Sequence, residues 1–305
     1  MSRWGWRIAV GVAVWLMVPA FFHAQESPAP QISPDVLVRQ TVAREIVEAN
    51  NPSSMHMFRS RRQSAKGSQT RLYIETRDAM AGMLIANNDQ PLSSQQQQAE
   101  VDHLNWLAGN PEQLRKKHAR EKEDADRTLR IVKALPDAFH YKYVGTEACR
   151  PDLGKPGDEL VKLEFTPNPS YSPPSKVEQV LEGMKGYLFI DTTVYRIALI
   201  DGTLFRDVSF GWGIIGRLDK GGRFRVQQAD VGDGSWEITQ MNLKITGRIL
   251  LFKSFSMISD ETFSDFRTVP LDLTFAKAVD MLKTEQEKLA HNHETEAAAE
   301  KKEPR

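Results

Sequence analysis

The sequence has almost no cysteine and no surplus of either charge. Its 305 residues include a single cysteine, Cys149, so an internal disulfide is impossible and the fold must depend on its core. Lys plus Arg and Asp plus Glu both number 40, which leaves no basic excess to attract nucleic acid. Hydrophobic residues make up 40% of the chain, enough for one large domain with a sizeable core.

The short motifs of common catalytic sites are also missing. The sequence contains no GxSxG, no HExxH, no phosphate-binding loop and no paired metal-ligand spacing. The acidic candidates are Asp207, Asp233 and the group Asp260, Glu261 and Asp265, at positions where strand ends and hairpins ordinarily carry acids. We therefore expect no catalytic residue, no metal and no cofactor. A tight cluster of these particular carboxylates with a histidine in a cleft would instead favour an enzyme.

The N-terminus carries a targeting signal. Arg3 and Arg7 precede an apolar run from Ile8 to Phe22, and Ala24 is a suitable cleavage position, so residues 1–24 are predicted to be a signal peptide. The run is shorter than the ~20 residues that cross a bilayer, which makes an uncleaved anchor the alternative. The leader predicts a periplasmic or secreted protein, and the proline-rich residues 25–33 predict a disordered tether.

Three regions have the pattern of helices. Ser33, Pro34 and Asp35 predict a capped start for a helix that ends near Asn51. Residues 93–135 predict a helical insertion of two helices, the second highly charged and docked mainly through its C-terminal half. A last helix is predicted over 275–289, followed by a disordered charged tail over 291–305.

The rest of the chain has the pattern of short strands. From 183 to 266 these strands are separated by pairs such as Asp201-Gly202 and Gly221-Gly222, which favour hairpin turns and an antiparallel meander. A change of apolar phase predicts a bulge near Thr239, and the apolar run 249–252 is expected near the middle of the sheet. The predicted fold is α+β: a large curved antiparallel sheet, or half-open barrel, with helices covering one face, in a single domain over 34–290.

The segment GYLFIDTTVYRIALIDG carries a family resemblance. Its Ile190-Asp191 pair and the tyrosine-led alternation from Tyr195 are similar to periplasmic outer-membrane lipoprotein-sorting and carrier proteins, over about 183–259. Two later stretches, DVSFGWGIIGRLDKGGRF and GRILLFKSFSMISDETFSDFR, look like exported acidobacterial-type proteins of the same group. The resemblance implies a half-open barrel whose helices cover a hydrophobic cavity for acyl chains, and it implies no catalytic activity.

These observations favour an exported, non-catalytic binding protein for a lipid, a lipoprotein acyl chain or another hydrophobic envelope ligand. The expected partners are that ligand or an envelope protein, with peripheral or no membrane contact. Two alternatives remain: an envelope sensor whose sheet is filled by its own helices, and a hydrolase with scattered carboxylates. The candidate cavity residues are the large apolar side chains Met80, Leu84, Phe189, Trp212, Ile214, Trp236, Leu251 and Phe252.

Overall fold

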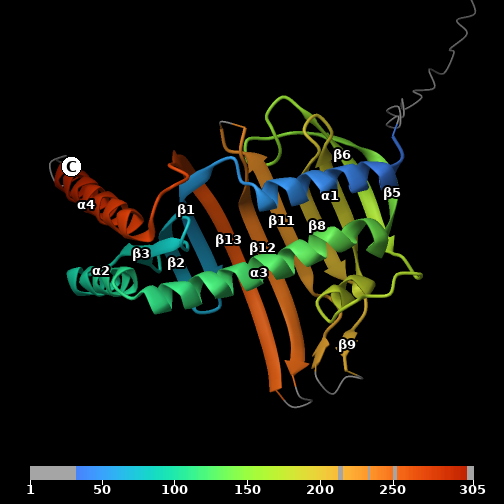
Figure 1. Cartoon of the computed structure of the whole chain (residues 1–305), viewed down its shortest axis with the longest axis horizontal. Coiled ribbons are helices and arrows are strands. Elements are labelled where there is room, and N and C mark those ends of the chain that lie inside the picture. Colours follow the sequence, from blue (N-terminus) through green and yellow to red (C-terminus); the bar gives the residue numbers. More distant parts are fainter. Residues whose placement is uncertain (1–31, 212–215, 233, 250–252, 301–305) are drawn as a thin grey trace, which may run out of the picture.

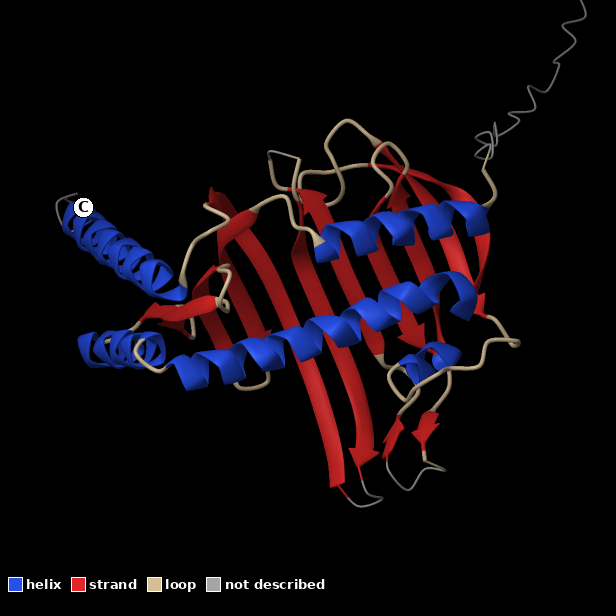
Figure 2. Ribbon diagram, in the orientation of Figure 1, coloured by secondary structure: helices blue, strands red, loops and turns tan. Residues whose placement is uncertain are grey.

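The computed structural model describes residues 32–211, 216–232, 234–249 and 253–300. In this part of the chain, thirteen strands form one antiparallel sheet that stays open, with β4 and β5 at its edges (Figures 1 and 2). The strand order is β4-β3-β2-β1-β13-β12-β11-β8-β7-β6-β5, with β9 and β10 paired beside β12. The predicted signal peptide, and the tether up to residue 31, lie outside the described residues.

Most strands of the sheet pair with the strand that precedes or follows them in the sequence. Its strands are β1 (Met55–Ser64), β2 (Gly67–Ile74), β3 (Ala81–Asn87), β4 (Gln90–Pro91), β5 (Phe139–Ala148), β6 (Glu159–Pro167), β7 (Met184–Asp191), β8 (Arg196–Leu204), β9 (Val208–Phe210), β10 (Gly216–Leu218), β11 (Arg223–Asp230), β12 (Trp236–Ile249) and β13 (Lys253–Val269). The helices are α1 (Pro34–Asn50), α2 (Ser94–Ala108), α3 (Pro111–Ala138), a short 3-10 turn η1 (Glu178–Gly183) and α4 (Phe275–Glu300).

Local sequence chemistry explains several boundaries. The Ser33 side chain accepts a hydrogen bond from the Val36 amide and starts α1, as predicted. Ser93 and Gln96 form a reciprocal capping box at the start of α2. The predicted bulge is also present, because the register between β11 and β12 shifts at Gln227 and skips Thr239.

Two sequence predictions differ from the structure, and a third is confirmed in part. Asp201 and Gly202 lie within β8 rather than in a turn, because both pair with β7 and with β11. Ile249 lies on β12, a middle strand of the sheet as predicted, but at the end of that strand opposite Lys253, where it is 44% exposed. Leu250, Leu251 and Phe252 lie outside the described residues. Helix α4 continues to Glu300, so residues 291–300 are helical where disorder is predicted. Ala and Glu have high helix propensity, which explains this continuation.

Helices α1 and α3 cross one face of the sheet, which we call the inner face (Figure 1). Over β5–β8 this face is filled: buried side chains of α1 and of the end of α3 pack on Leu163, Leu188 and Ile190. Each fully buried Leu or Ile contributes about 1.5–3 kcal/mol relative to an exposed one. This packing fixes α1 and the C-terminal end of α3 on the sheet.

At the other end of the sheet, α2 and α4 pack against β1–β3. Their core includes Leu72, Ile74 and Met83 of the strands with Phe275 and Leu282 of α4. Leu72 and Ile74 flank Tyr73, which lies with α3 residues around a shared pocket. Neighbouring side chains along a strand point to opposite faces, so α4 packs on the face of β2 opposite to the face near α3. None of the helices in the described part of the chain is long and apolar enough to cross a membrane.

Candidate functional site

A strip of apolar side chains follows the inner face of the three central strands. Ile200 of β8 packs on the α1–α3 core, so its side chain is on the inner face. Paired residues of neighbouring strands point to the same face, and Ile200 pairs with Val226, which pairs with Met241. The side chains of Val226 on β11 and Met241 on β12 are therefore also on the inner face. None of the strip residues is buried, in contrast to their counterparts on β6 and β7. The central strip comprises Phe224 and Val226 of β11, Met241, Leu243 and Ile245 of β12, and Phe255 and Met257 of β13.

The helix above these strands does not bury them. Seven consecutive residues of α3, Lys122 to Thr128, are all exposed, which is about two full turns and leaves no side of the helix packed. Ion pairs four residues apart, Lys122–Asp126 at 2.9 Å and Glu123–Arg127, support this segment from within. The middle of α3 therefore crosses β12 and β13 as an exposed helical segment that its own ion pairs stabilise (Figure 1).

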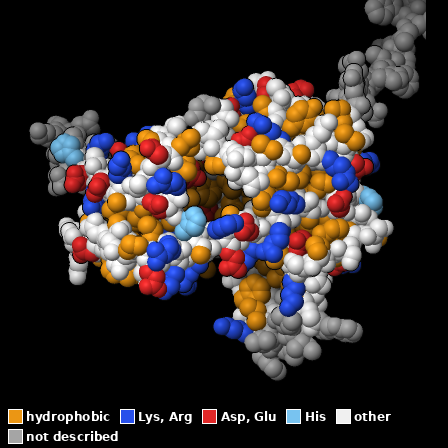
Figure 3. Space-filling model, in the orientation of Figure 1, with side chains coloured by type: hydrophobic (Ala, Val, Ile, Leu, Met, Phe, Trp, Pro, Cys, Tyr) orange, Lys and Arg blue, Asp and Glu red, His pale blue; other side chains and the backbone are white. Residues whose placement is uncertain are grey.

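The surface is hollowed between α1 and α3. Figure 3 shows this hollow above α3 and beside the end of α1, with hydrophobic side chains inside it. Below α3, the β12–β13 hairpin projects beyond the rest of the sheet (Figure 1), and Met257 on its inner face is 47% exposed. The central strip thus runs from the hollow, under α3, and out along the hairpin.

Polar groups border the central strip on the β1 side. Ser60 donates a hydrogen bond to Glu261, and Arg62 Nε donates to Ser259 Oγ at 2.9 Å. Pairing places these four side chains on the inner face beside Met241 and Leu243. An apolar surface bordered by the Arg62 guanidinium and the Glu261 carboxylate suits a ligand that has an apolar chain and a polar end.

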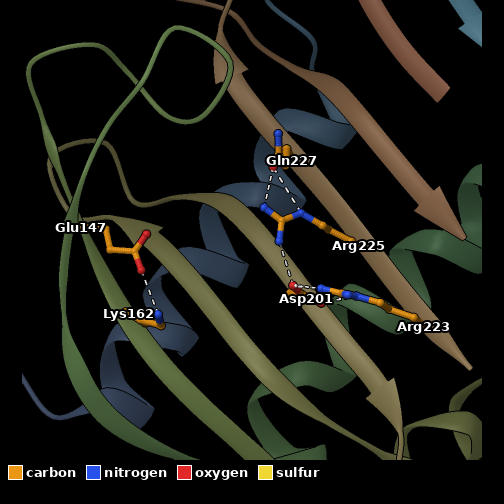
Figure 4. A network of polar contacts seen from close by, with 6 residues as sticks. All are labelled: Glu147, Lys162, Asp201, Arg223, Arg225 and Gln227. Atoms are coloured by element: carbon orange, nitrogen blue, oxygen red, sulfur yellow. Dashed lines mark hydrogen bonds and ion pairs between the residues drawn. The ribbon is translucent and has the colours of Figure 1, made fainter. Parts of the chain in front are cut away.

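Over part of the central strands the opposite face of the sheet carries charged side chains. Asp201 Oδ2 accepts hydrogen bonds from Arg223 and Arg225, both at 2.8 Å, and Arg225 also donates to Gln227. Figure 4 shows this network in front of the sheet, with the helices behind it. Beyond it, Lys162 donates to Glu147 at 2.8 Å. Charged side chains favour contact of this opposite face with water, whereas the inner face of the central strands is apolar, so the two faces differ sharply in polarity.

A separate cleft of about 350 Å³ lies where the end of α1 meets the sheet. Glu45 of α1 accepts hydrogen bonds from Arg196 Nε at 3.0 Å and from the Ile197 amide at 2.8 Å. The Arg196 guanidinium lies over the Trp236 ring at 5.7 Å. The cleft is also lined by Ser54, Ser235 and Glu237.

Two further acids have pKa values raised chiefly by burial. Burial raises the pKa of the Glu75 carboxyl, against a hydrogen bond from the His56 amide that lowers it. Burial and the nearby Asp158 raise the pKa of Asp191, although its Oδ1 accepts from the Thr193 amide at 2.9 Å. Asp191 therefore closes the turn between β7 and β8, which gives the Ile190-Asp191 pair a structural role.

The predicted cavity residues are dispersed over the fold. Phe189 is buried in the protein's own packing with Leu160 and Leu199, and Trp236 belongs to the same cluster while also lining the cleft. Met80 and Leu84 lie at β3, where their amides donate to Glu121 and Glu100. The remaining four, Trp212, Ile214, Leu251 and Phe252, lie outside the described residues.

Sequence reasoning missed the central strip residues on β11 and β12 because period-two alternation is common to every strand of such a sheet. It also missed His56, Glu75 and Glu237, which come from distant parts of the chain and meet beside the cleft that Glu237 lines. The sequence offered one signal for Glu237: it follows Trp236, a predicted cavity residue, close to the predicted bulge at Thr239.

Comparisons with known proteins give little support of their own. No protein-family model matches the chain, and no curated protein matches its sequence. A solved structure similar to this chain is a DUF1329 family protein from Desulfovibrio piger, with 11% identity and a TM-score of 0.26. The match covers 78% of this chain and 95% of that chain. At this TM-score the likeness carries no argument, so the predicted relation to lipoprotein-sorting proteins stays a prediction.

Proposed function

We propose that this protein binds an elongated apolar ligand, such as a lipid acyl chain, along the central strip beneath α3. The observation that carries the proposal is the combination of seven unburied apolar side chains on β11–β13 with an exposed, charged helix above them. Soluble proteins bury most large apolar side chains, and a larger exposed group marks a binding surface. A partner that covers the strip would remove this surface from water.

An acyl chain is the occupant that suits the strip best. It is a narrow, extended chain that can follow a strip of side chains across neighbouring strands, and each methylene that it buries gains about 0.8 kcal/mol. Arg62 at the border of the strip is placed to pair with an anionic end of such a ligand. The protein's own helices fill the inner face over β5–β8, whereas over β11–β13 they do not. A location in the cell envelope, which rests on the predicted leader, and a role without catalysis are parts of the same proposal.

Two adjacent residues of β13 provide a matched test. Met257 faces the strip and is 47% exposed, whereas Ile258 faces the opposite side and is 50% exposed. The purified protein is titrated with a dansyl-labelled undecanoic acid, and binding is followed by fluorescence. Met257→Gln should weaken binding by about 1 kcal/mol, or about fivefold in Kd, and Ile258→Gln should leave it unchanged.

Native mass spectrometry of the protein purified from membranes is the complementary measurement. A lipid that co-purifies with the parent protein, and is reduced in Met257→Gln, would support the proposal. Absence of saturable binding, or equal weakening by both substitutions, would show that the strip is not the binding surface.

A further inference from the structure

Three side chains from distant parts of the chain meet at the inner face near the cleft. His56 lies in β1, Glu75 follows β2, and Glu237 lies in β12. His56 Nδ1 is 3.1 Å from Glu237 Oε1 and 3.8 Å from Glu75 Oε2. One ligand atom from each residue lies within 4.8 Å of both others, so all three can reach a common point.

The histidine at the centre of this group is the informative residue. Its side chain is 2% exposed, and neither ring nitrogen makes a hydrogen bond within the described part of the chain. A buried imidazole ordinarily has a hydrogen-bond partner, because an unpaired polar group in a protein interior costs about 1–3 kcal/mol. A ligand at Nδ1 would account for this arrangement.

The backbone holds two of the three groups in place. The His56 amide donates to Glu75 Oε2 at 2.8 Å, and the Glu75 amide donates to the His56 carbonyl at 2.9 Å. The carboxylate of Glu75 is therefore fixed beside the imidazole before anything binds. Such preorganisation lowers the cost of assembling a coordination site.

We propose that His56, Glu75 and Glu237 form a binding site for a divalent first-row transition-metal ion of the Zn²⁺ type. Tetrahedral Zn²⁺ has bonds of about 2.0–2.2 Å to nitrogen and oxygen, which sets its ligands about 3.3–3.6 Å apart. The separations of 3.1 and 3.8 Å bracket that range. Two carboxylates balance the charge of a dication, and a neutral imidazole supplies the nitrogen ligand that Ca²⁺ and Mg²⁺ do not favour.

The site has an entry path and an open side. The side chains of Glu75 and Glu237 are 31% and 30% exposed, so an ion can reach them from solvent. Three protein ligands leave at least one position of a tetrahedral ion for water or another ligand. Glu237 also lines the cleft of about 350 Å³, which brings the ion next to a space that a small anionic molecule can enter.

Metal binding to the tag-free, full-length protein tests the proposal directly. After metal removal with a chelator, equilibrium dialysis against Zn²⁺ at pH 7.5 should give about one tightly bound ion per chain, with Mn²⁺ weaker. Ca²⁺ and Mg²⁺ at the same concentration should not bind. Electron paramagnetic resonance of the Cu²⁺-loaded protein should show coupling to one imidazole nitrogen.

Substitutions then assign the ligands. Glu75→Gln and Glu237→Gln should each weaken Zn²⁺ binding by at least about tenfold, and His56→Gln should abolish the nitrogen coupling. Glu75→Gln keeps an oxygen that can accept the His56 amide, and circular dichroism checks that each variant folds. Glu48→Gln, at the same cleft but outside the cluster, and His118→Gln, exposed on α3, are the controls and should bind Zn²⁺ normally.

Two results would overturn the proposal. One is a parent protein that binds no Zn²⁺ at stoichiometric level, which would identify the cluster as an ion pair between carboxylates and a protonated histidine. The other is folded Glu75→Gln and Glu237→Gln variants that retain full affinity, which would place any bound ion elsewhere. Neither result bears on acyl-chain binding, because the fatty-acid titration does not use these three residues.

Discussion

The inner face of the sheet is closed over β5–β8 and open over β11–β13, although the same helix crosses both regions. Over β5–β8, Leu163, Leu188 and Ile190 are at most 2% exposed beneath α1 and the end of α3. Over β11–β13, every residue of the central strip is half-buried or exposed. Strand alternation is the same in the two regions, so the difference comes from what lies above the sheet.

The sequence of α3 explains the contrast. Its last turns carry Ile131, Val132 and Leu135, which pack into the closed region. Its middle, Lys122 to Thr128, carries no large apolar side chain and is exposed on all sides. A helix covers a sheet only where it has an apolar stripe to offer, so closure follows the stripe rather than the helix.

The largest expected effect concerns the ion pair that holds α1 on the closed region. Glu45 and Arg196 have side chains that are 12% and 10% exposed. Glu45→Ala leaves a nearly buried guanidinium unpaired and should lower the free energy of unfolding by about 3–5 kcal/mol. Arg223, on the opposite face of the sheet, has a side chain that is 57% exposed, and Arg225 also pairs with its partner Asp201, so Arg223→Ala should cost about 0–1 kcal/mol. Urea denaturation of both variants measures the two losses in free energy of unfolding. Equal losses would show that the Glu45–Arg196 pair contributes no more to stability than the Arg223–Asp201 pair.

A second comparison uses the same substitution in both regions. Leu163 is 0% exposed, whereas Leu243 in the central strip is only partly buried. Leu163→Ala should lower the free energy of unfolding by about 2–5 kcal/mol, because it opens a cavity in a packed core. Leu243→Ala should cost about 1 kcal/mol, since part of its surface is already in water. Chemical denaturation without ligand gives both values, and a large loss for Leu243→Ala would indicate that the strip is packed.

The smallest expected effect is a pH dependence at the turn beside the closed region. The pKa of Asp191 is raised by burial, so the folded state releases this proton at a higher pH than the unfolded state does. The free energy of unfolding therefore falls as the pH rises from the ordinary carboxyl range near 4 towards the raised value. Asp191→Asn removes this fall while Oδ1 still accepts the turn amides.

The measurement for this third prediction is urea denaturation between pH 4 and pH 7. Relative to that of the parent protein, the free energy of unfolding of Asp191→Asn should increase with increasing pH. A difference between the two proteins that stays constant with pH, or changes in the opposite direction, would contradict the raised pKa.

Much of the fold is readable from local sequence. The Ser33 cap, the two helices of the insertion and the bulge at Thr239 each depend on residues within a few positions of one another. The Asp201-Gly202 pair gave a wrong turn because a glycine in a strand can also permit close approach of backbones. A side chain at Gly186 would place its Cβ 1.9 Å from the Asp201 carbonyl oxygen, so this part of the sheet needs glycine for contact rather than for turning.

The candidate sites were less predictable, because they are defined by pairing between distant strands. The sequence by itself determined the α+β class, the alternation of apolar and polar side chains, and a charged helix that could stabilise itself by pairs four residues apart. Only the tertiary structure decided that the charged part of α3 lies over β12 and β13, and that His56, Glu75 and Glu237 converge. Alternation states that a strand has two faces, but strand register and helix placement determine which face is covered and which residues meet there.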